Sequence, residues 1–291
     1  MRIAIVTCFF MLFSLIGCKQ SAHVEESFDP AKITTTTREV NEIIYSMYLP
    51  TDLADVLDET GTNYDAEVPA TIENYTLYKS EEQIAVMLGI YGADMMYMKL
   101  LGQIPSAAAY FQVIKNLAGK TDIPNRIFEG SIVRLEDNFT SQDSIAAIIT
   151  DIYAQTNAYF NKNGKKNLSS LSLLGGWIET MYIGVSMLQK DQYNTVMAEK
   201  ILQQKYSLNT IYTMMRNHQG SLVARKYLLL IKKLRQEFDK VEIKYPKDGF
   251  NVDTSNRKIQ SGKAEITYSE DTLKKITTLI TLIRNEIIKA E

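Results

Sequence analysis

The chain has 291 residues, with 32 Lys and Arg against 34 Asp and Glu, and 45% of its residues are hydrophobic. This is the composition of a globular protein, and it excludes collagen, coiled-coil rods and wholesale disorder. The net charge of −2 argues against a nucleic-acid binder, because such proteins need a basic surface that displaces counterions from phosphates. A chain of this length can bury the core of one large domain or of two small ones.

The N-terminal residues have the features of a secretory signal. Arg2 provides a short positive region, and the 14 residues from 3 to 16 are almost entirely apolar. A helix needs about 20 residues to cross a membrane, so this run is too short to span but suits the core of a signal peptide. We therefore expect residues 1–17 to be a signal peptide. The alternative to the lipid attachment described next is an ordinary secretory signal that is followed by an incidental cysteine, Cys18.

The apolar run ends in Leu15-Ile16-Gly17-Cys18. This ending resembles the lipobox of bacterial lipoproteins, in which the cysteine becomes the first residue of the mature chain and carries the lipid. The resemblance implies lipidation of Cys18 and attachment to a membrane through the acyl chains. By resemblance to sorting rules in other bacteria, Lys19 favours the outer membrane, and the face of that membrane stays open.

Few residues of the mature chain are suited to nucleophilic or metal chemistry. Cys8 leaves with the signal and Cys18 carries the lipid, so no thiol remains for a disulfide, a nucleophile or a zinc site. With His23 in the expected tether, His218 alone cannot build a Ser-His-Asp triad or a site with two histidines. The chain also lacks a phosphate-binding loop, G-x-S-x-G and H-E-x-x-H. We expect no metal and no cofactor.

The mature chain is divided by composition and by charge. Residues 18–48 are polar and rich in threonine, which predicts a lipidated tether, and residues 49–291 are expected to form a single helical domain. Between residues 25 and 67 there are eleven acids and two bases, whereas residues 216–247 contain nine bases and three acids. Such blocks are usually solvated faces; the alternative is that the basic block lies against anionic headgroups beside the lipid anchor.

Helix signals recur through the domain and predict an all-α fold, a bundle of several helices. Ser80-Glu81-Glu82-Gln83 is a capping box that opens a helix running to about Gly102. No proline occurs from residue 125 to 245, a stretch rich in good helix formers. Five further serines are predicted N-caps: Ser106, Ser141, Ser169, Ser207 and Ser269.

The last helix is expected over residues 269–291. Its apolar residues alternate steps of three and four, as in a stripe that docks one face against a bundle: Leu273, Ile276, Ile280, Ile283 and Ile287. Residues 241–268 are the exception to helical periodicity. Residues 241–245 and 264–268 alternate apolar and polar side chains at period two, which predicts either a small hairpin or an irregular flap.

A weak internal repeat relates two of the predicted helices. The segments around Asp94 and Glu179 align at an offset of 85 residues, and each follows a pair of glycines one turn or so earlier. Two copies of a four-helix unit, over residues 80–163 and 168–240, would explain this alignment. Chance similarity of short helical patterns is the alternative.

The same two acids are the strongest candidates for chemistry. Asp94 with Tyr97, and Glu179 with Tyr182, are spaced i,i+3 and so share a helix face. A two-fold arrangement of the repeats would bring the acids together, where they could bind a cation or act as general acid and base. Alternatively, each acid hydrogen-bonds a neighbouring helix inside the core. Trp177 would line the same ligand pocket or be buried beside it.

The lipobox, with the segments Tyr91-Gly92-Ala93-Asp94 and Gly175-Gly176-Trp177-Ile178-Glu179, resembles all-helical lipoproteins of Bacteroides-type bacteria. That group has no assigned activity, so the resemblance implies no catalytic residues. We expect a membrane-anchored envelope lipoprotein whose helical domain binds a partner protein or a small ligand. A hydrolase, a lyase or a metal binder that uses Asp94 and Glu179 is the alternative function.

Overall fold

The computed structural model describes residues 63–128, 151–152, 155–156, 158–191, 194–217, 220–245, 250–253, 258–261 and 264–289. All of them belong to one compact unit, Thr34–Glu291, while the other unit, Met1–Ile33, lies outside the described residues. The expected signal peptide, Cys18, the tether, the N-cap at Ser141 and His218 also lie outside them.

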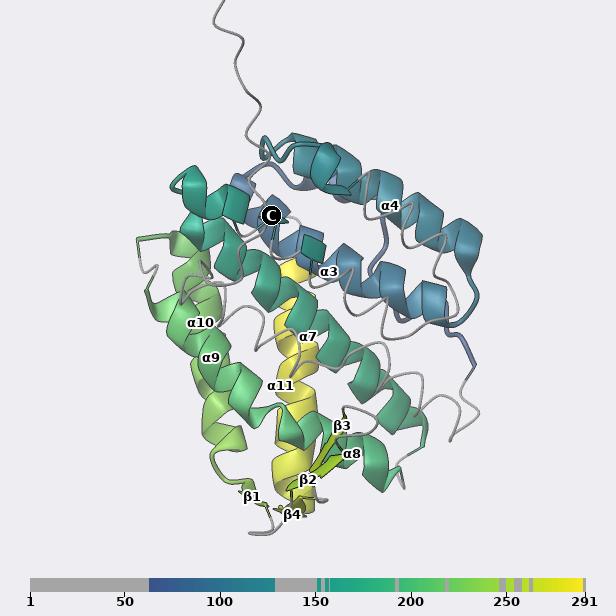
Figure 1. Ribbon diagram of the computed structural model, residues 1–291, viewed down its shortest axis with the longest axis vertical. Coiled ribbons are helices and arrows are strands. Elements are labelled where there is room, and N and C mark those ends of the chain that lie inside the picture. The colour runs from purple at the N-terminus through teal and green to yellow at the C-terminus, as the bar shows by residue number, and fades with distance from the viewer. Residues whose placement is uncertain are drawn as a thin grey trace, which may run out of the picture. The chain divides into compact units, whose positions relative to one another are not determined.

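The described part of the chain is mostly helical, with a small hairpin before the C-terminal helix. This confirms the predicted helical fold class (Figure 1). Its helices are η2 (Tyr75–Leu77), α3 (Glu81–Leu100), α4 (Ile104–Gly119), α7 (Lys166–Lys190), α8 (Thr195–Gln203), α9 (Lys205–Arg216), α10 (Leu222–Phe238) and α11 (Glu270–Ile288). α3 and α7 pack closely against each other, α4 covers α3, and α11 contacts both α7 and α10.

The predicted helix starts are right at both ends of the described chain. Ser80 accepts a hydrogen bond from the Gln83 backbone N–H, and the Gln83 side chain accepts one from the Ser80 N–H. The Ser269 hydroxyl accepts from the Thr272 backbone N–H at 3.1 Å and begins α11. Both caps satisfy N–H groups that have no partner inside the helix.

Three other predicted N-caps are wrong. Ser106, Ser169 and Ser207 each lie inside the first turn of a helix that begins two or three residues earlier. A serine in the first turn can bond to a neighbouring group instead of capping, as the Ser207 hydroxyl does with Gln204 Oε1 at 3.1 Å. Composition alone does not separate these positions from the caps that the structure uses at Ser221 and Asn194.

The close contact between α3 and α7 depends on glycine, as the sequence suggested. A Cβ atom on Gly89 would lie 2.0 Å from the Ser172 carbonyl oxygen, and one on Gly175 would lie 1.9 Å from the Val86 carbonyl oxygen. Real side chains cannot occupy such positions, so the two backbones come this close only because both residues lack a Cβ.

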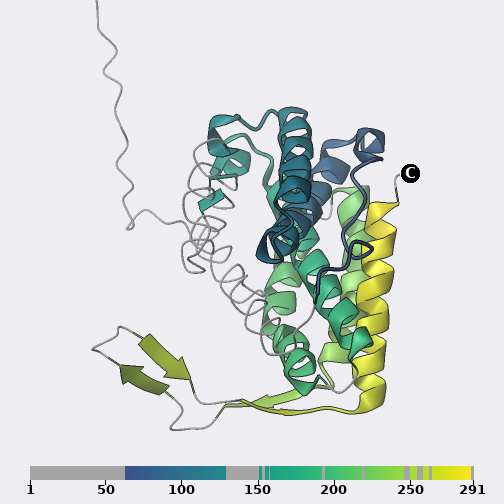
Figure 2. The ribbon, with the colours of Figure 1, turned by 90° about the vertical axis from the view of Figure 1, so that its right-hand side faces the viewer.

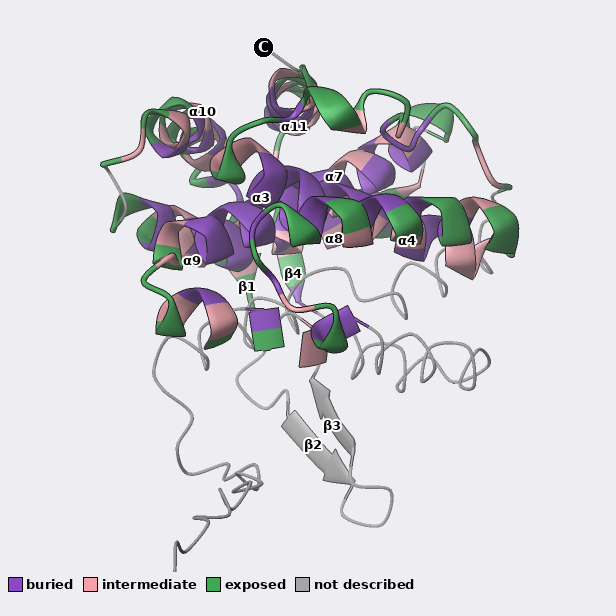
Figure 3. Cartoon of the chain, turned by 90° about the horizontal axis from the view of Figure 1, so that it is seen from above, coloured by how far each residue is buried: buried purple, intermediate pink, exposed green. Residues whose placement is uncertain are grey.

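Helix α7 is buried on nearly all sides (Figure 3). Among the described residues it is the one helix whose length and apolar character match a membrane span, and 89% of its apolar window is buried inside the protein. The central helix of a folded bundle shows the same combination, because it needs apolar residues on every face.

The segment between α10 and α11 is a hairpin rather than an irregular flap. Strand β1 (Glu242–Lys244) pairs antiparallel with β4 (Glu265–Thr267), and β2 (Phe250–Asp253) pairs antiparallel with β3 (Lys258–Ser261). Figure 2 shows this hairpin running out from the ends of α10 and α11. The predicted stripe of α11 is confirmed, since four of its five apolar residues are buried and Leu273 is half-buried.

Candidate functional site

The structure brings Asp94 and Glu179 together in the interior. Asp94 comes from α3 and Glu179 from α7, and both side chains are 0% exposed. Each carboxyl group shifts the pKa of the other, so the two groups lie close together. The glycine-mediated contact of α3 with α7 lies about one turn earlier on each helix, which is how two acids from separate helices come to meet.

Arg284 of α11 is the third member of this cluster. Its Nε lies 3.0 Å from Glu179 Oε2, and its Nη2 lies 3.1 Å from Glu179 Oε1, which is a bidentate ion pair. The same Nη2 donates to the Val68 carbonyl oxygen at 3.1 Å. The guanidinium carbon also stacks 4.3 Å from the centre of the Tyr182 ring. Burial raises the pKa of Glu179, but the cation held against both of its oxygens opposes that rise, so Glu179 is the acid of the pair that carries the negative charge.

Asp94 is the member that keeps a proton. Its Oδ2 accepts from the Ala70 N–H at 3.0 Å, whereas its buried Oδ1 has no partner among the described N–H and O–H donors. Burial raises the pKa of Asp94 well above its usual value, and the negative charge of Glu179 raises it further. A proton on Oδ1 lets Asp94 donate to Glu179, which resolves the missing partner. The cluster then carries one positive and one negative charge and is neutral overall.

The cluster also holds the stretch of chain that enters the bundle. We call residues 65–71 the strap, because this irregular segment crosses the helices and its backbone groups are bonded by side chains. Asp94 and Arg284 bind Ala70 N–H and the Val68 carbonyl, respectively. Three tyrosines also bond it: Tyr110 donates to the Ala70 carbonyl at 2.7 Å, Tyr91 donates to the Thr71 carbonyl at 3.0 Å, and Tyr97 accepts from the Asp65 N–H at 3.1 Å.

These contacts explain why polar side chains lie in the interior. A buried backbone group without a partner costs about 1–3 kcal/mol, and the strap has no neighbouring strand to supply partners. Burial also raises the pKa values of Tyr91 and Tyr110, so both phenols stay protonated and remain donors. The polar cluster therefore takes the place of regular secondary structure for this segment.

The remaining predicted site residues lie near the acids but do not bond to them. Tyr97 serves the strap, and Tyr182 packs against Arg284. Trp177 is 1% exposed, and its Nε1 has no hydrogen-bond partner among the described residues. Arg284 was not among the site residues predicted from the sequence, although a signal was present: it is a lone cation between Ile283 and Ile287 of an apolar stripe.

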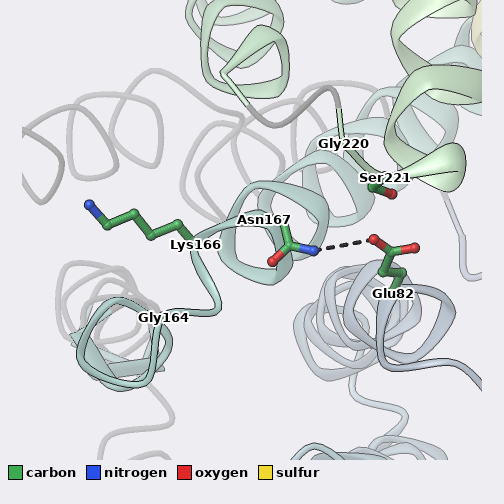
Figure 4. A pocket seen from close by; sticks show the side chains of 6 residues that line it. All are labelled: Glu82, Gly164, Lys166, Asn167, Gly220 and Ser221. Atoms are coloured by element: carbon green, nitrogen blue, oxygen red, sulfur yellow. Dashed lines mark hydrogen bonds between the residues drawn. The ribbon is translucent and has the colours of Figure 1, made fainter.

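A separate pocket lies where three helices begin (Figure 4). It has a volume of about 510 Å³ and is lined by Glu82, Gly164, Lys166, Asn167, Gly220 and Ser221. Asn167 Nδ2 donates to Glu82 Oε1 at 3.2 Å across it, whereas the Lys166 side chain points away from that pair. The side chains that line it are polar, but more of its exposed surface is apolar than polar and it is open to solvent, so a ligand there would meet a few polar groups on partly apolar walls.

The described residues contain no group of three His, Cys, Asp or Glu side chains placed to hold a metal ion. Among the described residues the acid pair is the one predicted constellation that the fold brings together, and with Arg284 it forms a buried, neutralised polar core. Comparison with models of known protein families, with curated proteins and with solved structures finds no match to this chain.

Proposed function

We propose that this protein is a lipid-anchored protein of the bacterial cell envelope whose helical domain binds a partner protein or a small ligand and catalyses no reaction. The observation that carries the proposal is the burial of the acid pair. Asp94 and Glu179 are 0% exposed, and the hydrogen bonds that they accept from described residues come from the strap and from Arg284. The strongest candidates for chemistry are thereby committed to holding the fold.

Anchoring rests on the resemblance of Leu15-Ile16-Gly17-Cys18 to a lipobox. Residues 1–17 would be removed, Cys18 would carry the lipid, and the tether would extend from the outer membrane to the domain. The strap is the first part of the domain that the structure describes after the tether, and side chains from α3, α4 and α11 hold its backbone. Such a connection ties the anchored end of the chain directly to the core.

The alternative, a hydrolase or lyase that uses Asp94 and Glu179, has less support. A general acid or base must come within about 3 Å of a substrate atom or of a bridging water. Neither carboxyl group has any exposed surface, and Arg284 neutralises the ionised one. A metal held by these two acids is disfavoured for the same reason, because the guanidinium already occupies the position that a cation would take.

For a small ligand, the pocket at the starts of α3, α7 and α10 is the better location. It presents a carboxylate at Glu82, an amide at Asn167 and a hydroxyl at Ser221. These groups both donate and accept hydrogen bonds, which matches a polar molecule that carries hydroxyl or amide groups.

We also propose that α3 and α7 open two related four-helix units, residues 80–163 and 168–240. The support is a reciprocal contact: Gly89 approaches the residue three before Gly175, and Gly175 approaches the residue three before Gly89. This reciprocity relates positions 86 residues apart, one more than the 85 that align the acids. A local two-fold axis between the helices would produce such a pair of contacts.

Two measurements test the function. Mass spectrometry of the full chain expressed in a bacterial envelope should find residue 18 as the N-terminus with attached acyl chains, and Cys18→Ala should abolish the modification. An unmodified chain cut elsewhere would contradict the anchor. Capture of envelope partners by the purified domain should be unchanged in Asp94→Asn. Loss of a measured turnover in that variant would favour the enzyme instead.

A further inference from the structure

The outward face of α10 differs from the other helix surfaces. We define the α10 face as the seven exposed positions of this helix: Leu222, Arg225, Lys226, Leu229, Lys232, Lys233 and Gln236. At about 100° per residue they occupy a single arc of roughly 120° on the helix surface. The face contains two leucines, four bases and no acid, while the opposite side of α10 is buried against the bundle.

The leucines of this face are unusually exposed. Leu222 is 76% exposed and Leu229 is 66% exposed, the two highest values among the large hydrophobic residues that the structure describes. They lie seven residues apart, so they follow one line along the helix. Leu282 of the adjacent helix α11 is also 44% exposed. The bases flank this line on both sides.

The neighbouring helix α11 shows what an ordinary solvated face looks like. Its exposed charges have both signs and pair with each other, as in Lys275 with Asp271 at 2.6 Å. On the α10 face, Lys226 lies 3.9 Å from Glu286. Arg225, Lys232 and Lys233 form no ion pair with any described residue. The α10 face therefore presents uncompensated positive charge beside exposed leucine.

We propose that the α10 face docks on the anionic headgroups of the membrane in which the protein is anchored, with Leu222 and Leu229 entering the boundary between headgroups and acyl chains. This inference rests on the lipid anchor proposed above. Helices that lie in the membrane interface combine a basic rim with an apolar line in this way. Each Lys or Arg near an anionic surface adds about 1 kcal/mol, which is about a fivefold change in binding.

The anchor makes such docking geometrically easy. A random coil of about 30 residues, the length that the sequence predicts for the tether, has a root-mean-square length of about 30 Å, which is comparable with the size of a domain. The tether therefore keeps the domain near the bilayer without dictating which face touches it. The α10 face sets the orientation of the domain relative to the bilayer, because its charge and its apolar surface both favour contact with lipid.

A lipid surface fits the α10 face better than other acidic partners. A nucleic acid is disfavoured by the overall charge of −2 and the isoelectric point near 5.9. The acidic stretch 25–67 of the same chain could satisfy the bases, but charge pairing gives no reason for leucines at 76% and 66% exposure. Insertion into the interface accounts for both features together.

Vesicle binding tests the proposal with the mature chain bearing Cys18→Ala, so that no lipid contributes. We expect it to sediment with phosphatidylcholine vesicles that contain 30% phosphatidylglycerol, and not with pure phosphatidylcholine. Raising the salt from 50 to 500 mM should release it. Lys232→Glu with Lys233→Glu should weaken binding at least 25-fold, since two favourable contacts become repulsive. Leu222→Ser with Leu229→Ser should weaken it without changing its salt dependence.

The matched control is Lys274→Glu with Lys275→Glu on α11, which makes the same change in net charge and should leave vesicle binding unaltered. Circular dichroism should show that all variants keep the helical fold.

The proposal is overturned if both charge-reversal variants lose vesicle binding equally, or if the mature chain does not bind vesicles at 50 mM salt. Binding that occurs only after residues 19–62 are removed also overturns it and assigns the α10 face to the acidic stretch. If mass spectrometry finds lipid on Cys18 of the unaltered chain but the Cys18→Ala chain does not bind vesicles, this inference alone is refuted. If the Cys18→Ala chain binds vesicles but the unaltered chain carries no lipid on Cys18, the anchor is refuted.

Discussion

The buried acid cluster and the α10 face use the same chemical groups in opposite surroundings. Arg284 is 6% exposed, and its guanidinium bonds Glu179 and the strap through Nε and Nη2 and stacks on the ring of Tyr182. Lys232 and Lys233 are exposed and have no carboxylate partner among the described residues. Arg284 is part of the core, whereas Lys232 and Lys233 are available to an anionic partner outside the chain.

Burial, and not charge itself, therefore decides whether an ionisable residue holds the fold or is available for binding. Removing one partner of a buried pair leaves an uncompensated charge in a low dielectric and is strongly destabilising. Changing an exposed charge alters stability very little, although it can alter association with an oppositely charged surface. Stability and binding measurements should therefore separate the two regions.

The largest effect is expected in the buried cluster. Arg284→Met should lower the free energy of unfolding by about 3–5 kcal/mol, because Glu179 would lose the cation that holds it and the Val68 carbonyl would lose its donor. Urea unfolding followed by circular dichroism measures this. Arg225→Met on the α10 face is the matched control and should stay within about 0.5 kcal/mol of the parent. A loss below 1 kcal/mol in the first variant would show that the cluster is not structural.

The next largest effect is expected at the contact that brings the acids together. Gly175→Ala places a methyl group against the Val86 carbonyl, so α3 and α7 must move apart, with an expected loss of about 1–3 kcal/mol or more. Gly119→Ala is the control, since no atom lies within 4 Å of its added Cβ and alanine favours a helix. The two thermal midpoints should shift in opposite directions or differ clearly; equal shifts would argue against a close contact.

A smaller, pH-dependent effect is expected at Asp94. An unfolded aspartate loses its proton near pH 3.9, about its ordinary value, whereas the folded protein keeps this proton because the pKa of Asp94 is raised. The stability contributed by the proton is complete below pH 4 and declines as the pH rises toward the folded pKa. Asp94→Asn carries no such proton, so its stability relative to the parent should improve from pH 4.5 to pH 7.

The same position offers an internal comparison. In Asp94→Asn the amide keeps an acceptor for the Ala70 N–H and a donor for Glu179, which are the two bonds of the protonated acid. In Asp94→Ala both bonds are lost, so we expect it to be less stable than Asp94→Asn by about 1–3 kcal/mol at every pH. If unfolding curves show that Asp94→Asn is the more damaging substitution at pH 7, the amide does not reproduce the two bonds assigned to the protonated acid.

The smallest effect on stability is expected on the α10 face. Lys232→Glu with Lys233→Glu should change the free energy of unfolding by no more than about 0.5 kcal/mol, because both side chains are exposed and unpaired among the described residues. The same variant is expected to lose most of its vesicle binding. A large loss of stability would instead place these lysines in contacts that hold the fold.

Local signals predicted the secondary structure well where the chemistry is local. The capping box at Ser80 and the cap at Ser269 begin helices, and the period-two segments form the paired strands β1 and β4. Ser106, Ser169 and Ser207 were wrongly predicted as N-caps, because a serine in the first turn has the same sequence surroundings as a capping serine. A hydroxyl can serve either position, so only the backbone conformation separates the two.

The candidate site depended on tertiary contacts to a greater degree. The spacing of Asp94 and Glu179 after paired glycines indicated which helices would meet, and the structure places the two acids together. Their partner Arg284 lies 105 residues beyond Glu179, and the strap lies 24 residues before Asp94. No local pattern connects positions so far apart, since their contact exists only when α11 and the strap fold against the central pair of helices.

The residues alone predict that this chain forms a helical domain, where several of its helices begin, and which segments carry an acidic or basic excess. These properties follow from hydrogen bonds and side-chain periodicity within one element. The tertiary structure alone decided that two acids become a buried core and that the leucines of α10 stay outside. Burial is a property of how helices pack, and packing depends on every element at once.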